Sequence, residues 1–261
     1  MKKIALAAFG LACALPAGAQ QAPDAPITVL AAGSLRDVMR ELGDAWRKDG
    51  GAGIAATYGP SGKLRQEIEG GRQVDVFASA SIDHTEALAA KKLLSRSVTF
   101  AYNDLCVVST PALGLSESTL VDTLLKPSVR LATSTPVSDP MGDYTWQFFR
   151  NADKMQTGAF ARFEAKALKL SGASAPAPGE KLPYVTAFED NRADAYIMYC
   201  TNGAGTLRAL PQLQVLRIPD ALNVRSAYGI GAAPGSRAGE RFVDFVMGPA
   251  GKAILRRHGF N

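Results

Sequence analysis

The chain has 261 residues, of which 47% are hydrophobic and 20% are charged, and its net charge is +5. A chain of this length and apolar content can bury one large core or two medium ones, and we expect two lobes. Because Lys and Arg are scattered among Asp and Glu, without a basic stripe interleaved with aromatic residues, nucleic acid is not an expected partner.

Residues 1–19 are predicted to be a secretory signal peptide. A basic start and an apolar run, IALAAFGLACAL, lead to the small-residue cleavage site Ala17-Gly18-Ala19. The run is too short to span a bilayer, so we expect an exported, periplasmic protein that begins near Gln20. A lipid anchor on Cys13 is the less favoured alternative, because the cleavage site explains the segment without it.

From residue 27 onward, strand and helix patterns alternate. Strands are expected at 27–32, 54–59 and 75–80, and helices at 35–50, 61–71 and 84–93. This alternation predicts a parallel, doubly wound α/β sheet. A long β-rich run at 98–110 precedes a second alternation, which starts at 130 and includes helices at 143–155 and 158–170 and a strand at 194–202. A strand pair at 222–233 and a final helix broken at Gly248-Pro249 follow.

The two alternations predict two α/β lobes joined by a hinge. We expect lobe I to comprise residues 27–100 and 222–261, and lobe II residues 101–221. Ligands of such sheets bind beyond the carboxyl ends of the strands, and a cleft between lobes is a preferred place for a pocket.

Two segments of lobe I share one pattern, in which a strand runs into a small-residue turn and then a serine. Ser34 follows ITVLAAG, and Ser61 follows IAATYGP. Each serine is predicted to be the N-cap of the next helix, where a hydroxyl and free backbone N–H groups point to one place. Two such turns on one rim favour a small oxyanion, with no metal and no formal positive charge required. Simple helix capping is the competing interpretation of each serine.

Lobe II has a corresponding turn at Ser138-Asp139-Pro140, where a cap precedes proline at the first helical position. Met141 is expected to present its backbone N–H there. A carboxylate at Asp143 would repel an anion unless it points away, and helix-dipole stabilisation is its alternative role. Tyr199 ends the strand DAYIMY, and its hydroxyl either donates into the cleft or belongs to the packing at the rim.

The sequence shows no signature of an enzyme. The two histidines, His84 and His258, are far apart and have no nucleophile motif nearby. YGPSGK fits neither a G-x-S-x-G elbow nor a P-loop. Outside the predicted signal, Cys106 and Cys200 are either a disulfide or two buried thiols.

The ordered set of segments resembles the periplasmic molybdate-binding proteins of ABC importers over essentially the whole mature chain. The segments that carry the resemblance are ITVLAAGSL, YGPSGKLRQEIEGG, DVFASAS, NDLCVV, the DP-x-G turn, DAYIMY and FVDFVMGPAGKAILRRHGF. The resemblance implies a type II periplasmic-binding fold that closes on a tetrahedral oxyanion. It assigns ligand contacts to Ser34, Ser61, Met141 and Tyr199. One further family contact, from the loop before DAYIMY, has no clear counterpart.

The resemblance also implies the function and the partners. We expect a monomeric, non-enzymatic solute-binding protein without a cofactor, which captures molybdate or tungstate and delivers it to a membrane ABC permease. In the type II topology the strands that bear Cys106 and Cys200 are neighbours, which favours the disulfide. Another oxyanion, a small organic anion, or a periplasmic enzyme built on the same lobes are the alternatives.

Overall fold

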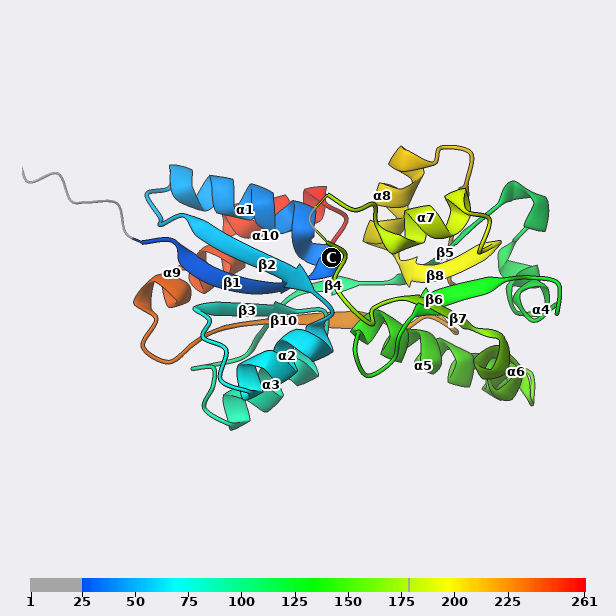
Figure 1. Ribbon diagram of the computed structural model, residues 1–261, viewed down its shortest axis with the longest axis horizontal. Coiled ribbons are helices and arrows are strands. Elements are labelled where there is room, and N and C mark those ends of the chain that lie inside the picture. The colour runs from blue at the N-terminus through cyan, green and yellow to red at the C-terminus, as the bar shows by residue number, and fades with distance from the viewer. Residues whose placement is uncertain (1–24, 178) are drawn as a thin grey trace, which may run out of the picture.

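The computed structural model of the chain describes residues 25–177 and 179–261, so the predicted signal peptide lies outside the described residues. Two five-stranded sheets, each with helices against it, form two lobes that lie side by side (Figure 1). The expected α/β architecture of two lobes is therefore confirmed.

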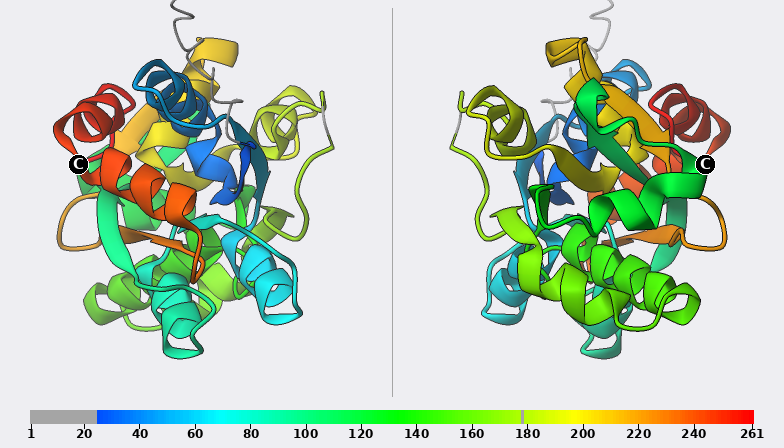
Figure 2. Two further views of the ribbon diagram at one scale, coloured as in Figure 1. Left: turned by 90° about the vertical axis from the view of Figure 1, so that its left-hand side faces the viewer. Right: turned by 90° about the vertical axis from the view of Figure 1, so that its right-hand side faces the viewer.

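The first lobe has the strand order β2-β1-β3-β10-β4. Its strands are β1 (Ile27–Ala32), β2 (Ile54–Gly59), β3 (Val76–Ser79), β4 (Val98–Asn103) and β10 (Ser226–Ala232). Its helices are α1 (Arg36–Lys48), α2 (Ser61–Glu69), α3 (Ile82–Ala90), α9 (Arg237–Met247) and α10 (Pro249–Arg257), and they lie on both sides of the sheet (Figure 2). The expected strand pair at 222–233 is wrong, because one strand, β10, forms there and runs antiparallel to both β3 and β4.

The second lobe has the strand order β7-β6-β8-β5-β9. Its strands are β5 (Leu105–Ser109), β6 (Leu131–Ser134), β7 (Leu168–Ser171), β8 (Ala195–Tyr199) and β9 (Gln214–Arg217). Its α-helices are α4 (Leu120–Leu124), α5 (Pro140–Met155), α6 (Ala159–Lys166), α7 (Pro183–Glu189) and α8 (Cys200–Ala209). The helix expected at 158–170 ends at Lys166, because the chain then pairs with β6 as the edge strand β7.

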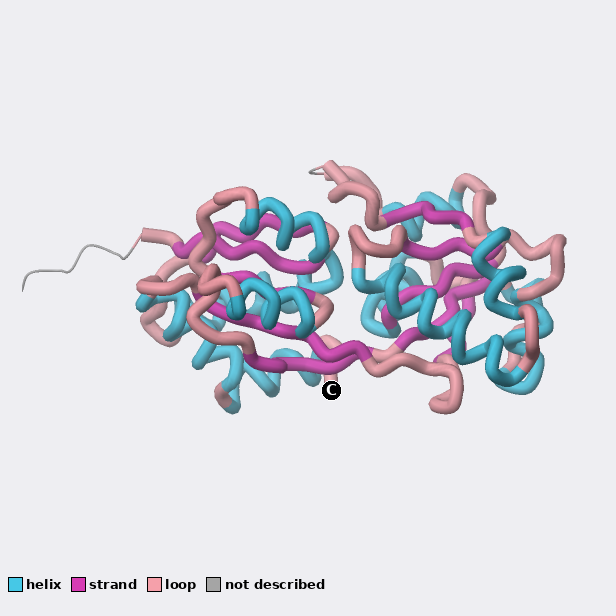
Figure 3. Tube along the Cα trace, turned by 90° about the horizontal axis from the view of Figure 1, so that it is seen from below, coloured by secondary structure: helices cyan, strands magenta, loops and turns pink. Residues whose placement is uncertain are grey.

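Extended connections join the lobes (Figure 3). The β-rich run at 98–110 divides at Asp104, since β4 pairs with β10 in the first sheet and β5 pairs with β8 and β9 in the second. The chain returns between β9 and β10. Backbone hydrogen bonds between Tyr102 and the C-terminal Asn261 hold the end of the chain against β4, near the junction of the lobes.

Central strands carry unbroken apolar runs because helices cover both faces of each sheet. All residues of β3 and all residues of β8 are buried. Parallel pairing aligns β1 with β2 from Ile27 to Ala32, so both strands end at the same edge. The turns that follow them, at Gly33-Ser34 and Pro60-Ser61, therefore lie together on the side of the first lobe that faces the second.

A disulfide joins Cys106 on β5 to Cys200 at the start of α8. In the antiparallel ladder Cys106 lies opposite Met198, and Cys200 follows the last residue of β8. The bond therefore ties the first turn of α8, and Tyr199 directly before it, to the strand that enters the second lobe.

Candidate functional site

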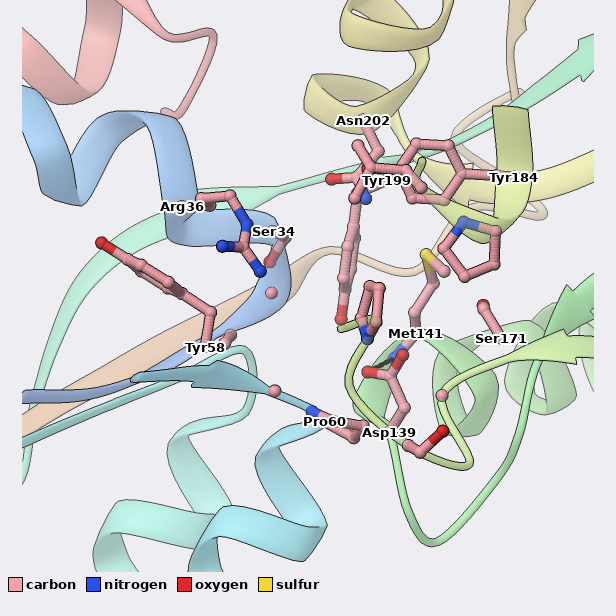
Figure 4. Close-up of a pocket in the computed structure, with 18 residues that line it drawn as sticks. Ser34, Arg36, Tyr58, Pro60, Asp139, Met141, Ser171, Tyr184, Tyr199 and Asn202 are labelled. Atoms are coloured by element: carbon pink, nitrogen blue, oxygen red, sulfur yellow. Dashed lines mark hydrogen bonds between the residues drawn. The ribbon is translucent and has the colours of Figure 1, made fainter. Parts of the chain in front are cut away.

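A pocket lies between the two lobes, and its cavity volume is about 70 Å³. The first lobe lines it with Ala32, Gly33, Ser34, Arg36, Tyr58, Gly59 and Pro60. The second lobe lines it with Asp139, Met141, Ser171, Gly172, Ser174, Pro176, Leu182, Pro183, Tyr184, Tyr199 and Asn202. Figure 4 shows the two sets facing each other. The space is enough for a few water molecules or one small solute.

Ser34 presents its hydroxyl to this pocket through a chain of hydrogen bonds. Asn103 Nδ2 donates to Tyr228 Oη over 3.3 Å, and Tyr228 Oη lies 3.0 Å from Ser34 Oγ. Either hydroxyl can be the donor of this bond. Where Tyr228 donates to Ser34 Oγ, the proton of Ser34 is available to a ligand oxygen. The predicted N-cap role of Ser34 is wrong, because Ser34 lies within the 3₁₀ turn Gly33–Leu35 and makes no capping bond.

Ser61 is placed differently from Ser34. It is the first residue of α2, whose N-cap is Pro60, and its hydroxyl accepts from Ala80 N over 3.1 Å, so its predicted capping role is also wrong. The physical reason is the same for both serines: a partner on another element satisfies the hydroxyl. Ser61 is 1% exposed and lies outside the set of residues that line the pocket. Its hydroxyl proton is not used by the bond to Ala80.

Tyr199 lines the pocket from the end of β8 (Figure 4). Its side chain packs edge-on against Tyr144 of its own lobe and Tyr228 of the other, with ring centroids 6.5 and 5.5 Å away. Its hydroxyl oxygen is buried and makes no hydrogen bond of normal geometry with any described residue. Burial raises the pKa of Tyr199 well above its usual value, so the group stays a neutral donor.

The start of α5 brings Met141 and Asp139 to the pocket. Asp139 is the N-cap of this helix, and its carboxylate accepts from Met141 N over 3.3 Å and from Ser134 Oγ over 2.5 Å. Desolvation raises the pKa of Asp139. Asp143 lies outside the pocket lining, and its Oδ1 accepts from Val137 N over 2.8 Å. The carboxylate that borders the pocket is therefore Asp139.

Three further side chains of the pocket were not expected from the sequence. Arg36 and Tyr58 come from the first lobe, with the Arg36 guanidinium carbon 4.7 Å from the centre of the Tyr58 ring. Tyr184 comes from α7, which follows the Pro-, Ala- and Gly-rich loop of the second lobe. The expected site needed no positive charge, yet a guanidinium lies on its wall. The one available signal was the position of Arg36, two residues after Ser34.

The lobes touch directly beside the pocket. Gly62 N, at the start of α2, donates to Ser138 O of the other lobe over 3.0 Å. A Cβ atom at Gly62 would lie 2.3 Å from Val137 O. Only glycine allows this approach of the two backbones.

Within residues 25–177 and 179–261, no group of three or more His, Cys, Asp or Glu side chains is arranged to hold a metal ion. In the same part of the chain, no helix is both long and apolar enough to cross a membrane.

The cleft between two α/β lobes, with hydroxyl donors on facing walls, is the arrangement of a solute-binding protein. The chain matches the family of bacterial extracellular solute-binding proteins over residues 27–261, and it belongs to that family. The family and the proteins that share the fold are solute-binding proteins rather than enzymes.

Three proteins are similar to this chain over most of its length. The uncharacterized protein PM1146 of Pasteurella multocida is 34% identical over 236 residues, which are 89% of this chain and 97% of that protein. The molybdate-binding protein ModA of Escherichia coli is 26% identical over 254 residues, which are 94% and 92% of the two chains. The periplasmic molybdate-binding protein of Azotobacter vinelandii has the same fold, with a TM-score of 0.71, 17% identity, and coverage of 90% and 98%. The resemblance to molybdate-binding proteins and the type II periplasmic-binding fold are therefore confirmed.

Proposed function

We propose that this protein captures molybdate, or the similar tungstate, in the cleft between its lobes and delivers it in the periplasm to the permease of an ABC importer. The observation that carries the proposal is the pair of neutral hydroxyl donors, Ser34 and Tyr199, which line one small pocket from opposite lobes. Neutral donors in a partly dehydrated cleft stabilise an oxyanion by hydrogen bonding and select it by size. The similarity to ModA supports molybdate as the anion.

Two further contacts belong to the same proposal. Ser61 has a hydroxyl proton that its bond to Ala80 does not use, and Ser61 directly follows Pro60, which lines the pocket. Met141 N donates to the Asp139 carboxylate over a long 3.3 Å, so a ligand oxygen can compete for this N–H. Binding would draw the lobes together around the anion, and the permease would recognise this form.

A second candidate ligand is a small organic anion. Both walls also carry apolar or aromatic side chains, Tyr58 on the first lobe and Leu182 and Tyr184 on the second, which suit a carbon-containing substituent better than a bare oxyanion.

Isothermal titration of the purified protein with molybdate, tungstate, sulfate and phosphate tests the proposal. We expect submicromolar binding of the first two and at least 100-fold weaker binding of the others, about 2.7 kcal/mol in binding free energy. A panel of small carboxylates and phosphonates covers the second candidate. Binding only to members of that panel would replace molybdate as the ligand, and no heat with any anion would refute an anion-binding function.

A further inference from the structure

One charged side chain of the first lobe reaches the pocket wall. Arg36 is the first residue of α1 and follows Ser34 by two positions, so both lie on the same wall (Figure 4). Among the described residues that line the pocket, Arg36 is the one cation and Asp139 is the one anion. The pocket therefore has a positive group on the wall of the first lobe and a carboxyl group on the wall of the second.

The Arg36 side chain is exposed, and its guanidinium is not neutralised by an ion pair with another described residue. It lies over the Tyr58 ring, and no hydrogen bond or ion pair joins it to any other described residue. The neighbouring carboxylate, Asp37, is engaged elsewhere, by Arg40 at 3.3 Å and by Arg208 at 4.0 Å. A contact with a ring face leaves the five in-plane N–H donors of a guanidinium available.

The two kinds of donor differ in what they depend on most. Hydrogen bonds from Ser34 and Tyr199 depend steeply on the positions of the ligand oxygens, and so on size and shape, and they also strengthen with ligand charge. The attraction of Arg36 depends on the charge of the ligand and doubles from a monoanion to a dianion. Arg36 therefore adds to the charge dependence of the site without adding a strict requirement on oxygen positions.

We propose that Arg36 is a specificity-determining residue, which makes this pocket prefer tetrahedral dianions over monoanions of the same shape and size. The inference rests on the proposed oxyanion function and adds a selection by charge beyond that of the serine and tyrosine hydroxyls. Because the interaction energy is proportional to ligand charge, removing the cation lowers the affinity for a dianion by the square of the factor that applies to a monoanion.

The test compares molybdate with perrhenate, a tetrahedral monoanion of similar size, by isothermal titration. For Arg36→Gln we expect the affinity for molybdate to fall about tenfold and that for perrhenate about threefold, so that the preference for the dianion falls about threefold. Arg36→Lys, which keeps the charge, should retain most of the preference. The matched control is Arg40→Gln, which removes the same charge one turn further along α1 from a residue that does not line the pocket.

Each outcome has a defined meaning. Equal losses for the two anions, no loss, or the same change in Arg40→Gln would overturn the role of Arg36 while leaving the proposed function intact. If the unsubstituted protein binds neither anion, the proposed function fails and this inference fails with it. Arg36→Gln should also make molybdate binding less sensitive to added salt than in the unsubstituted protein, because a screened charge has been removed.

Discussion

At the level of single residues, Ser34 and Ser61 have different hydrogen-bond partners. Their replacement by alanine should therefore affect molybdate affinity and stability to different extents. Ser34→Ala removes a pocket donor and also the hydrogen-bond partner of the buried Tyr228 hydroxyl, which keeps its bond from Asn103. A hydrogen bond to a charged group contributes about 1.5–3 kcal/mol, so we expect molybdate affinity to fall by at least about tenfold, together with a fall of a few degrees in melting temperature from the Tyr228 hydroxyl.

Ser61→Ala is the matched comparison. It leaves the buried N–H of Ala80 without its acceptor, at a cost of about 1–3 kcal/mol in the free energy of unfolding. We expect the melting temperature to fall by roughly 3–10 °C, together with whatever affinity the Ser61 hydroxyl supplies. Titration and thermal melts of both variants separate the two effects. A stability loss in Ser34→Ala with unchanged affinity would contradict the role assigned to its hydroxyl.

Asp139 gives the site a dependence on pH. Its pKa is raised in the folded protein, so the folded state holds this proton at pH values where the unfolded state has released it. The contribution of Asp139 to stability is therefore greatest at low pH and is lost as pH rises from about 3.8 through the raised pKa. Asp143 adds like charge in this region, while the phenols of Tyr184, Tyr196 and Tyr199 stay neutral.

We expect Asp139→Asn to keep the helix cap and to remove this dependence. At pH 8 the variant should bind molybdate several-fold more tightly than the unsubstituted protein, because a carboxylate beside a dianion is repulsive. The difference should shrink as pH falls toward 4. Titration at several pH values measures it, and a variant that binds more weakly at pH 8 would show that the carboxylate helps to hold the ligand.

Some residues of the site could be predicted from sequence and others could not. Ser34 follows a strand, Tyr199 ends one and Met141 opens the helix after one, and the topology of an α/β sheet places strand ends and the helix starts after them at the cleft. The sequence also predicts Asp139 as a helix cap. Whether Asp139 lines the pocket depends on how the second lobe faces the first, which the sequence pattern does not give. The contribution of Tyr184 depends on the path of an irregular loop, for which a sequence pattern carries little information.

At the scale of elements, the start of α2 is the place where the lobes meet. Gly62 admits the backbone of the loop before α5, and Val137 in that loop has a φ of 69°, which is strained for a β-branched residue. Gly62→Ala would force the lobes apart locally, at a cost of about 1–3 kcal/mol for the closed arrangement.

For Gly62→Ala we therefore expect molybdate affinity to fall about tenfold and the ligand-saturated protein to have a larger radius of gyration in small-angle X-ray scattering. Gly205→Ala on α8 is the control, because its Cβ would meet nothing nearer than an Arg208 side-chain nitrogen at 3.6 Å. Unchanged affinity in Gly62→Ala would show that this contact does not contribute to closure.

The element boundaries that differ from expectation have a tertiary cause. The β-rich run at 98–110 is continuous as a pattern, yet Asp104 divides it because its two halves pair in different sheets. The serine N-caps were wrong for a similar reason, since partners from β10 and from the turn after β3 take the hydroxyls. Local patterns located the strands and helices and did not determine these partners.

At the scale of the whole molecule, the disulfide closes a large loop of the second lobe. Cys106 and Cys200 are 94 positions apart, and a cross-link of that span is worth up to about 4–5 kcal/mol in the loop-entropy account. We expect the double variant Cys106→Ser/Cys200→Ser to melt roughly 10 °C below the oxidised protein. Calorimetry with and without a reductant measures this, and the reductant should lower the melting temperature of the unsubstituted protein alone. Equal melting temperatures would show that the bond is dispensable for stability.

The Tyr199 hydroxyl affects how often the protein closes without a bound anion. The Tyr199 hydroxyl makes no hydrogen bond of normal geometry with any described residue, and lobe I contributes to its burial through Tyr228, so its poor hydrogen bonding costs up to about 1–3 kcal/mol. A ligand oxygen removes this cost, so anion binding raises the ratio of closed to open protein by up to about 150-fold. A permease that recognises the closed form would then seldom bind the protein without its ligand. Little ATP would be hydrolysed without an anion being transported.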